Sequence, residues 1–125
     1  MSKFQPDGWR TVTPRIVTSD VRGLAEFVRA VFDASGEERV GAPTELKIGD
    51  SIVMVSGDSE REAMPAFLYV YVADADATYR RAIALGARSI EEPRDTPYGD
   101  RRAMVQDSWG NKWQIATHQG RAASS

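Results

Sequence analysis

The sequence predicts an α+β fold made of two βαβββ modules in one domain. Two observations point to it. A segment rich in β-branched residues (11–20) ends in Asp20 before an amphipathic helix, and a second strand-like segment (66–74) ends in Asp74 before another helix. Each half also closes with a strand that follows a glycine turn, at Gly49 and at Gly110. The same order of elements therefore occurs twice along the chain.

The first module is expected over about residues 11–56. After the strand at 11–20, apolar residues recur at helical spacing in "VRGLAEFVRAVF", at Leu24, Phe27, Val28 and Val31. Three short strands are expected next, around 38–40, 44–48 and 51–55. The pair Gly49-Asp50 is typical of the hairpin turn between the last two.

The second module is expected over about residues 66–118, after a polar linker at about 57–65. Its first strand, "AFLYVYVAD" (66–74), leads into a helix that Gly86 ends. "RSIEEP" is extended, and "RRAMVQD" and "NKWQIATH" are two strands joined by "SWGN". The small, polar residues at 119–125 predict a flexible tail.

Composition excludes several classes of function. A net charge of -2 with dispersed lysines and arginines argues against binding to nucleic acid or to an anionic membrane. The absence of cysteine excludes a thiolate metal site, a disulfide framework and a thiol nucleophile. The first residues have no apolar core of the signal-peptide type, so we expect a cytoplasmic protein.

The doubled βαβββ order, the segment "YGDR" and the turn "D-x-x-G-N-x-W" together resemble the vicinal oxygen chelate superfamily. This superfamily contains glyoxalase I, bleomycin-resistance proteins and extradiol dioxygenases. The resemblance covers about residues 11–118, and its most specific part is "YGDRRAMVQDSWGNKWQIATH" (98–118). It implies two modules whose mixed sheets curl into an open cup, and a chain that pairs as a homodimer.

The resemblance also implies four positions that hold a divalent metal in the family's enzymes. Counted from Asp20, Asp74, Gly49 and Gly110, these positions carry side chains that are mostly unsuited to a metal: Thr13, Val53, Phe67 and Gln114. A shift of the register by one residue brings in no better donor. The single histidine, His118, lies about 13 Å beyond Gln114 along a strand, too far to complete the site. We therefore expect no metal and no other cofactor.

Strand alternation predicts which side chains line the cup instead. Phe67, Tyr69 and Tyr71 share one face of their strand, and Lys112 and Gln114 share the corresponding face of the last strand. The predicted ligand-binding residues, which include a cation on the first strand and two residues of a neighbouring loop, are Arg15, Phe67, Tyr69, Tyr71, Tyr98, Arg101, Lys112 and Gln114. Aromatic planes beside cationic side chains suit a small planar or amphipathic molecule.

These observations favour a metal-independent protein that binds a small molecule, such as an antibiotic or a metabolite. Two alternatives remain open. A lyase, isomerase or dioxygenase could act in the same cup, with Tyr69, Tyr71 or Arg15 as the acid or electrostatic stabiliser in a metal-free version. The metal-dependent version is disfavoured because the donors are missing. The chain could also be a protein-interaction module without a ligand.

Overall fold

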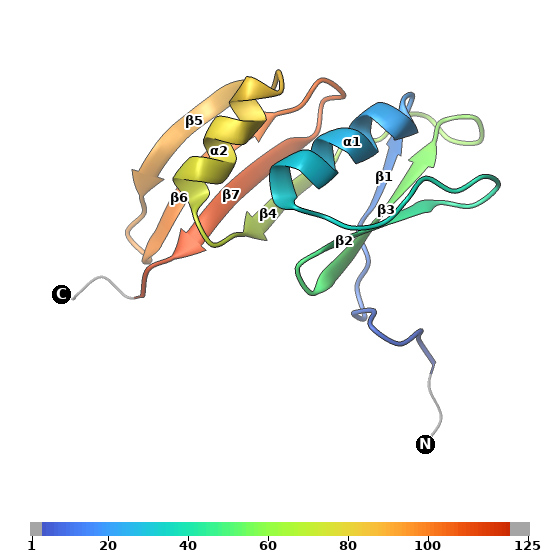
Figure 1. Ribbon diagram of the computed structural model, residues 1–125, viewed down its shortest axis with the longest axis horizontal. Coiled ribbons are helices and arrows are strands. Elements are labelled where there is room, and N and C mark those ends of the chain that lie inside the picture. The colour runs from blue at the N-terminus through green and yellow to red at the C-terminus, as the bar shows by residue number, and fades with distance from the viewer. Residues whose placement is uncertain (1–3, 121–125) are drawn as a thin grey trace. The chain divides into compact units, whose positions relative to one another are not determined.

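The structure is a computed structural model that describes residues 4–120. The α+β class is confirmed: the chain forms two small mixed sheets, each with one helix (Figure 1). It divides into two compact units, Met1–Met64 and Pro65–Ser125, and each is described by itself. Most of the predicted flexible tail, at 121–125, lies outside the described residues. Over the described range, neither helix has the length and apolar character needed to cross a membrane.

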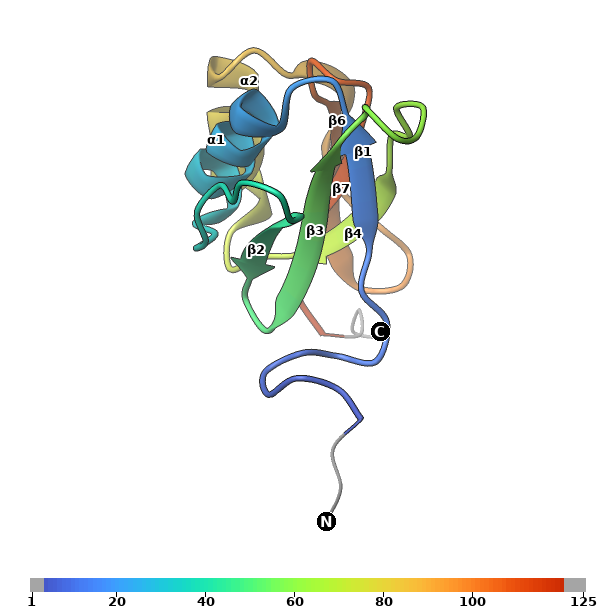
Figure 2. The same ribbon diagram turned by 90° about the vertical axis from the view of Figure 1, so that its right-hand side faces the viewer.

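The first unit contains four elements, in the order β1 (Arg15–Thr18), α1 (Val21–Phe32), β2 (Thr44–Ile48) and β3 (Ser51–Gly57). The strands form a sheet in the order β1-β3-β2, in which β1 is parallel to β3 and β2 is antiparallel to it. Figure 2 shows α1 beside this sheet, which it contacts at β2 and β3.

The amphipathic pattern of α1 is confirmed. The carboxylate of Asp20 caps the helix by accepting a hydrogen bond from the Gly23 amide at 2.9 Å. One face of the helix is buried, through Leu24, Ala25, Phe27, Val28, Val31 and Phe32. Burial of this face supplies half of the buried apolar residues of the first unit, and the three strands supply the other half.

The predicted strand around residues 38–40 is wrong. The backbone amide of Arg39 donates to the Thr44 hydroxyl rather than to a neighbouring strand, and Val40 is fully exposed. Gly36 and Gly41, on either side of this segment, both have positive φ angles, which interrupt an extended chain. One isolated bridge between Ser35 and Lys47 is the only pairing here, so the first sheet has three strands.

The second unit follows the predicted order in full. Its elements are β4 (Phe67–Tyr71), α2 (Ala75–Ala84), β5 (Arg88–Asp95), β6 (Asp100–Gln106) and β7 (Lys112–His118). The strands are arranged β4-β7-β6-β5, with β4 parallel to β7 and the other pairs antiparallel. As predicted, the Asp74 carboxylate caps α2, and Gly86 follows its end with a φ of 100°.

Strand alternation gives the second sheet two different faces. Trp113 and Ile115 on β7 are fully buried, and Thr117 on the same face bonds to the amide of Ala75 at the start of α2. This face therefore packs against α2. The opposite face, which we call the tyrosine face, carries the alternate residues of the four strands: Phe67, Tyr69, Tyr71, Arg88, Glu91, Arg94, Asp100, Arg102, Met104, Gln106, Lys112, Gln114, Ala116 and His118.

A buried carboxylate fixes the turn between β6 and β7. One oxygen of Asp107 accepts from the indole nitrogen of Trp113 at 2.8 Å and from the side-chain amide of Asn111 at 2.9 Å. The other oxygen accepts from the backbone amides of Trp109 and Asn111, both at 2.9 Å. The turn thereby sets the register of β7 and holds Trp113 in the core.

Replacement of this carboxylate should destabilise the whole protein. In Asp107→Ala, the buried donors of Asn111 and Trp113 lose their acceptor, and we expect a loss on the order of 3 kcal/mol in the free energy of unfolding. Urea denaturation followed by circular dichroism measures it. The matched control is Asp58→Ala, at an exposed position, which should change the stability by less than about 0.5 kcal/mol. Equal stabilities of the two variants would contradict this role of Asp107.

Candidate functional site

Three aromatic side chains of β4 lie in a row on the tyrosine face. Phe67, Tyr69 and Tyr71 are 64%, 37% and 60% exposed, which is unusual for large aromatic rings on a strand. The rings of Tyr69 and Tyr71 are tilted by 58°, with centroids 5.4 Å apart. Exposed rings in this arrangement offer flat apolar surface to a planar molecule.

The carboxylate of Asp100 holds the two tyrosines in place. Asp100 begins β6, is only 1% exposed, and accepts hydrogen bonds at one oxygen from Tyr69 at 2.6 Å and from Tyr71 at 2.8 Å. Its backbone is fixed by Thr96, whose hydroxyl accepts from the Asp100 amide and donates to the Asp100 carbonyl. The carboxylate is thus a rigid acceptor beneath an exposed face.

The second oxygen of Asp100 is bonded to His118. The distance from Nδ1 of His118 to this oxygen is 2.8 Å, and the residues are directly opposite each other on β6 and β7. An ionised carboxylate accepts only, so Nδ1 carries the proton of this hydrogen bond, and in the neutral form of the imidazole the lone pair is at Nε2. The imidazole side chain is 60% exposed although its partner is buried.

A further chain of hydrogen bonds extends from Tyr69 to β5. The guanidinium of Arg102 makes a bidentate pair with Glu91, at 2.9 and 3.0 Å, and donates to the Tyr98 hydroxyl at 2.7 Å. The Tyr98 and Tyr69 hydroxyls are 3.4 Å apart. Because Tyr69 gives its proton to Asp100, Tyr98 is the donor to Tyr69. Arg102 therefore donates in two directions, to Glu91 on one side and to Tyr98 on the other, and from Tyr98 onward each hydroxyl donates toward Asp100.

The electrostatics agree with these hydrogen bonds. Burial opposes the ionisation of Asp100, but the hydrogen bonds from Tyr69, His118 and Tyr71 outweigh it, so the pKa of Asp100 is lowered. Burial, followed by the hydrogen bond to Asp100, raises the pKa of Tyr69 well above its ordinary value. The same hydrogen bond is the main cause of the raised pKa of Tyr71. At neutral pH the site therefore holds an ionised Asp100 and two protonated tyrosines.

Six of the predicted ligand-binding residues belong to this part of the second unit: Phe67, Tyr69, Tyr71, Tyr98, Lys112 and Gln114. The predicted alternation is confirmed, with Gln114 opposite Tyr69 of β4 and Met104 of β6. Tyr98 reaches the same face from the loop before β6 through its contact with Arg102. Whether these residues bind a ligand stays a prediction.

Arg101 does not lie on the tyrosine face, contrary to the prediction. Its guanidinium pairs with both carboxylate oxygens of Asp76 in the first turn of α2, at 3.0 and 3.1 Å, and with Asp95 at 3.4 Å. Because neighbouring residues of a strand point to opposite faces, Arg102 takes the position that the sequence analysis gave to Arg101.

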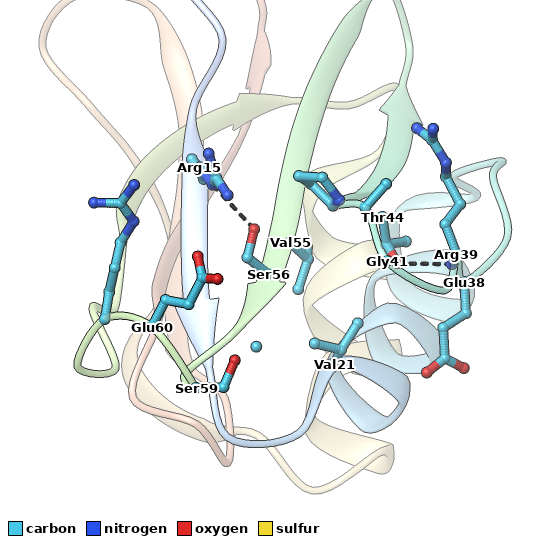
Figure 3. A pocket seen from close by; sticks show the side chains of 14 residues that line it. Arg15, Val21, Glu38, Arg39, Gly41, Thr44, Val55, Ser56, Ser59 and Glu60 are labelled. Atoms are coloured by element: carbon cyan, nitrogen blue, oxygen red, sulfur yellow. Dashed lines mark hydrogen bonds between the residues drawn. The ribbon is translucent and has the colours of Figure 1, made fainter.

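Arg15 belongs to the first unit, where it lines a cleft of about 390 Å³. Figure 3 shows the side chains of Arg15 and Ser56 pointing toward each other, and Nε of Arg15 donates to the serine hydroxyl at 3.0 Å. Among residues 4–120 no carboxylate forms an ion pair with Arg15 within 4.0 Å. The guanidinium is therefore available to an anionic group.

The cleft is less organised than the tyrosine face. Its charged lining residues are of both signs, namely Arg15, Glu38, Arg39, Glu60 and Arg61, and all are exposed. Arg39 is already paired with Glu45, at 2.6 Å. Exposed charges of mixed sign are screened by water and give little net attraction to a charged ligand. The cleft is therefore a weaker candidate for a binding site than the tyrosine face.

The four positions at which the family holds a metal do not fit one in this chain. Thr13 precedes β1, and Val53 is 4% exposed, in the core of the first unit. The register shows that Met54, not Val53, is opposite Arg15, as Gln114 is opposite Tyr69. Within residues 4–120 no three histidine, aspartate or glutamate side chains are grouped as metal ligands. Valine and phenylalanine offer no donor atom. The observed register replaces Thr13, Val53 and Phe67 by Arg15, Met54 and Tyr69, of which the arginine is a cation and the tyrosine hydroxyl already donates to Asp100.

Sequence reasoning missed Asp100, Arg102 and His118. A signal for Asp100 was present in the segment "YGDR", which was quoted only for its resemblance. His118 has the same strand parity as Gln114, but only the pairing of β6 with β7 brings it opposite Asp100. Along its own strand His118 is about 13 Å from Gln114, whereas on the neighbouring strand its partner Asp100 is directly opposite.

Ionisation of the tyrosines should report on Asp100. Because the folded-state pKa values of Tyr69 and Tyr71 are raised above 10.0, both keep their protons above pH 10, where an unfolded chain loses them. This contribution to stability is present below pH 10 and is lost as the pH rises toward the folded values. The measurement is the tyrosinate absorbance of the folded protein between pH 9 and pH 12.

Asp100→Asn should shift part of this titration to lower pH, because it removes the negative charge that the hydroxyls face. The control is Asp95→Asn, which changes a carboxylate paired with Arg101 on the other face of the sheet and should leave the tyrosine titration unchanged. Superimposable curves for the wild type and Asp100→Asn would contradict the assigned hydrogen bonds.

Three comparisons with known proteins agree with this fold. The chain is similar to an uncharacterised protein of Mycobacterium bovis, 26% identical over 122 residues, with 83% of this chain and 80% of the relative covered. It is also similar to the structure of TioX from Micromonospora sp. ML1, with 24% identity, a TM-score of 0.75, and 87% and 98% of the two chains covered. A glyoxalase/bleomycin resistance protein/dioxygenase family enzyme from Burkholderia phytofirmans PsJN gives 24% identity and a TM-score of 0.73, with 85% and 96% covered.

At these identities the two structures show a shared fold. The family itself is shown by the sequence, because the family model described as Glyoxalase/Bleomycin resistance protein/Dioxygenase superfamily matches residues 11–115. That range includes β1 at one end and most of β7 at the other. The chain belongs to the Glyoxalase/Bleomycin resistance protein/Dioxygenase superfamily.

Proposed function

We propose that this protein binds a small planar molecule on the tyrosine face, without a metal. The observation that carries the proposal is the row of exposed rings on β4, two of which are fixed by the buried carboxylate of Asp100. A preformed surface loses little conformational entropy when a ligand stacks on it. Exposed aromatic side chains that are held rigidly are therefore better suited to binding than mobile ones.

Polar groups beside the rings would orient the ligand. Gln114 lies opposite Tyr69 and is half-buried, and Lys112 lies opposite Phe67 and is exposed. Within the described residues, no hydrogen bond or ion pair engages the side chain of either one. An amide and an ammonium at the edge of an aromatic surface suit a planar molecule that carries a carboxylate or a carbonyl group.

The geometry argues against Tyr69 or Tyr71 as a catalytic acid. Both hydroxyl protons are already donated to Asp100, and the raised pKa values of the two tyrosines make proton release harder. To act as an acid, either tyrosine would first have to break its hydrogen bond to Asp100. Arg15, the other residue considered for this role, belongs to the cleft of the first unit.

The test is a titration with 2-naphthoic acid and with its uncharged analogue 2-naphthamide, followed by backbone amide NMR. We expect saturable shifts at Tyr69, Tyr71 and Gln114 and tighter binding of the acid. Phe67→Ala and Tyr71→Ala should each weaken binding by about tenfold, because each removes one stacking ring. Neither ring is buried, so both variants should fold.

Arg15→Ala is the matched control for the site. It removes an exposed cation from the first-unit cleft and should leave the dissociation constant unchanged. If Arg15→Ala weakens binding while Tyr71→Ala does not, the cleft is the binding site and the proposal is wrong. An absence of saturable shifts with either probe, at millimolar concentration, would favour a protein-interaction module instead.

Metal independence, a homodimer and a cytoplasmic location complete the proposal. Protein purified without chelator should contain much less than one metal ion per chain by elemental analysis. Light scattering should give the mass of two chains of 13.8 kDa each. One metal ion per chain would contradict metal independence and favour the metal-dependent chemistry of the superfamily. A mass of one chain would contradict the homodimer.

A further inference from the structure

We propose that His118 is a general base that removes a proton from a planar molecule bound on the tyrosine face, with Asp100 as its positioning residue. The inference rests on the proposed function, because it needs a ligand on that face. The substrate class is a planar compound with a weakly acidic C–H or O–H group next to its ring. The activity would be metal-free proton abstraction, as in an isomerase or a lyase.

The geometry of the pair supports this role. The buried carboxylate of Asp100 accepts the Nδ1 proton of His118 at 2.8 Å, which leaves the lone pair at Nε2 as the basic atom. A base must be accessible, and the imidazole is 60% exposed while its carboxylate partner is 1% exposed. When Nε2 takes a proton, the imidazolium that forms is stabilised by the adjacent carboxylate, which lies in a region shielded from water.

The base is next to the proposed binding surface. Asp100 is bonded through one oxygen to His118 and through the other to Tyr69 and Tyr71. One carboxylate therefore holds the imidazole through one oxygen and the exposed tyrosine rings through the other. Because Asp100 already receives three donors, it is occupied as an acceptor, and Nε2 of His118 is the basic site left for a ligand stacked on this face.

A planar test substrate can separate binding from proton transfer. In 5-nitrobenzisoxazole, loss of the proton on C3 breaks the N–O bond, forms a nitrile and releases a coloured phenolate. The proton goes to Nε2 of His118 and then to water, so the step needs no other reactant. Its 3-methyl analogue has the same planar rings and lacks the abstractable proton. Amide NMR with the analogue reports binding alone, and absorbance with the parent compound reports turnover.

We expect wild-type protein, assayed with EDTA at pH 7.5, to release phenolate about 100-fold faster than His118→Gln, within the range of general-base contributions. His118 is the only histidine in the chain, so this variant removes every imidazole. The analogue should bind both proteins equally. A difference in turnover below tenfold, with binding retained, overturns the inference and leaves the binding function intact. Absence of binding to the wild type overturns both.

Two further variants test how the base is held. His118→Gly should regain turnover when free imidazole is added, which a purely structural histidine would not show. Asp100→Asn should lower kcat, because the base loses its charged partner, and should also raise KM, because Tyr69 and Tyr71 lose the carboxylate that holds their rings. A rise in KM at unchanged kcat in Asp100→Asn would remove Asp100 from the proposal as the positioning residue. Asp58→Asn, in the first unit, is the control and should match the wild type.

Discussion

The buried carboxylate of Asp100 is the interaction on which the second unit's exposed face depends. A carboxylate out of contact with water is costly unless donors surround it, and here two tyrosine hydroxyls and one imidazole do so. These three bonds also determine how the donors are oriented. Side chains that would otherwise rotate freely in water are fixed at 2.6 to 2.8 Å from one group, and the result is a rigid surface that combines aromatic planes with a directed lone pair.

Such an arrangement is more typical of a functional site than of a structural one. If Asp100 served only to stabilise the unit, an apolar residue of similar size would avoid the cost of burying a charge. The Asp107 carboxylate shows the contrast within the same sheet. Its donors, Asn111 and Trp113, are themselves fully buried, and the group holds a turn. The side chains that donate to Asp100 are instead largely exposed. The free-energy cost of burying this carboxylate therefore serves to orient side chains on a surface.

The superfamily scaffold explains why this chemistry can differ from that of a metal site. A mixed sheet offers several strand positions whose side chains can face a ligand, and the fold does not require that they carry metal donors. In this chain the residues opposite each other at such positions are Arg15 of β1 with Met54 of β3, and Tyr69 of β4 with Gln114 of β7. With aromatic, amide and cationic side chains at such positions, the surface can still bind a ligand without a metal. Proton transfer then requires a different residue, which is His118 in our proposal.

The sequence by itself determined the α+β class, the helix cap at Asp74, and the sides of β4 and β7, because these follow from contacts between residues close in the chain and from strand alternation. It left the cap of α1 open between Ser19 and Asp20, and the structure assigns it to Asp20. The same local reasoning wrongly predicted a strand around residues 38–40, where glycines with positive φ on both sides interrupt the extended chain. It also assigned Arg101 to the binding surface, whereas Arg101 is on the face that packs against α2. Only the tertiary structure brought His118 to Asp100, which is 18 residues away. That contact depends on the register between β6 and β7, which the side-chain hydrogen bonds of Asp107 set in the turn; the sequence indicated a turn here, and only the structure shows these bonds and the register they impose.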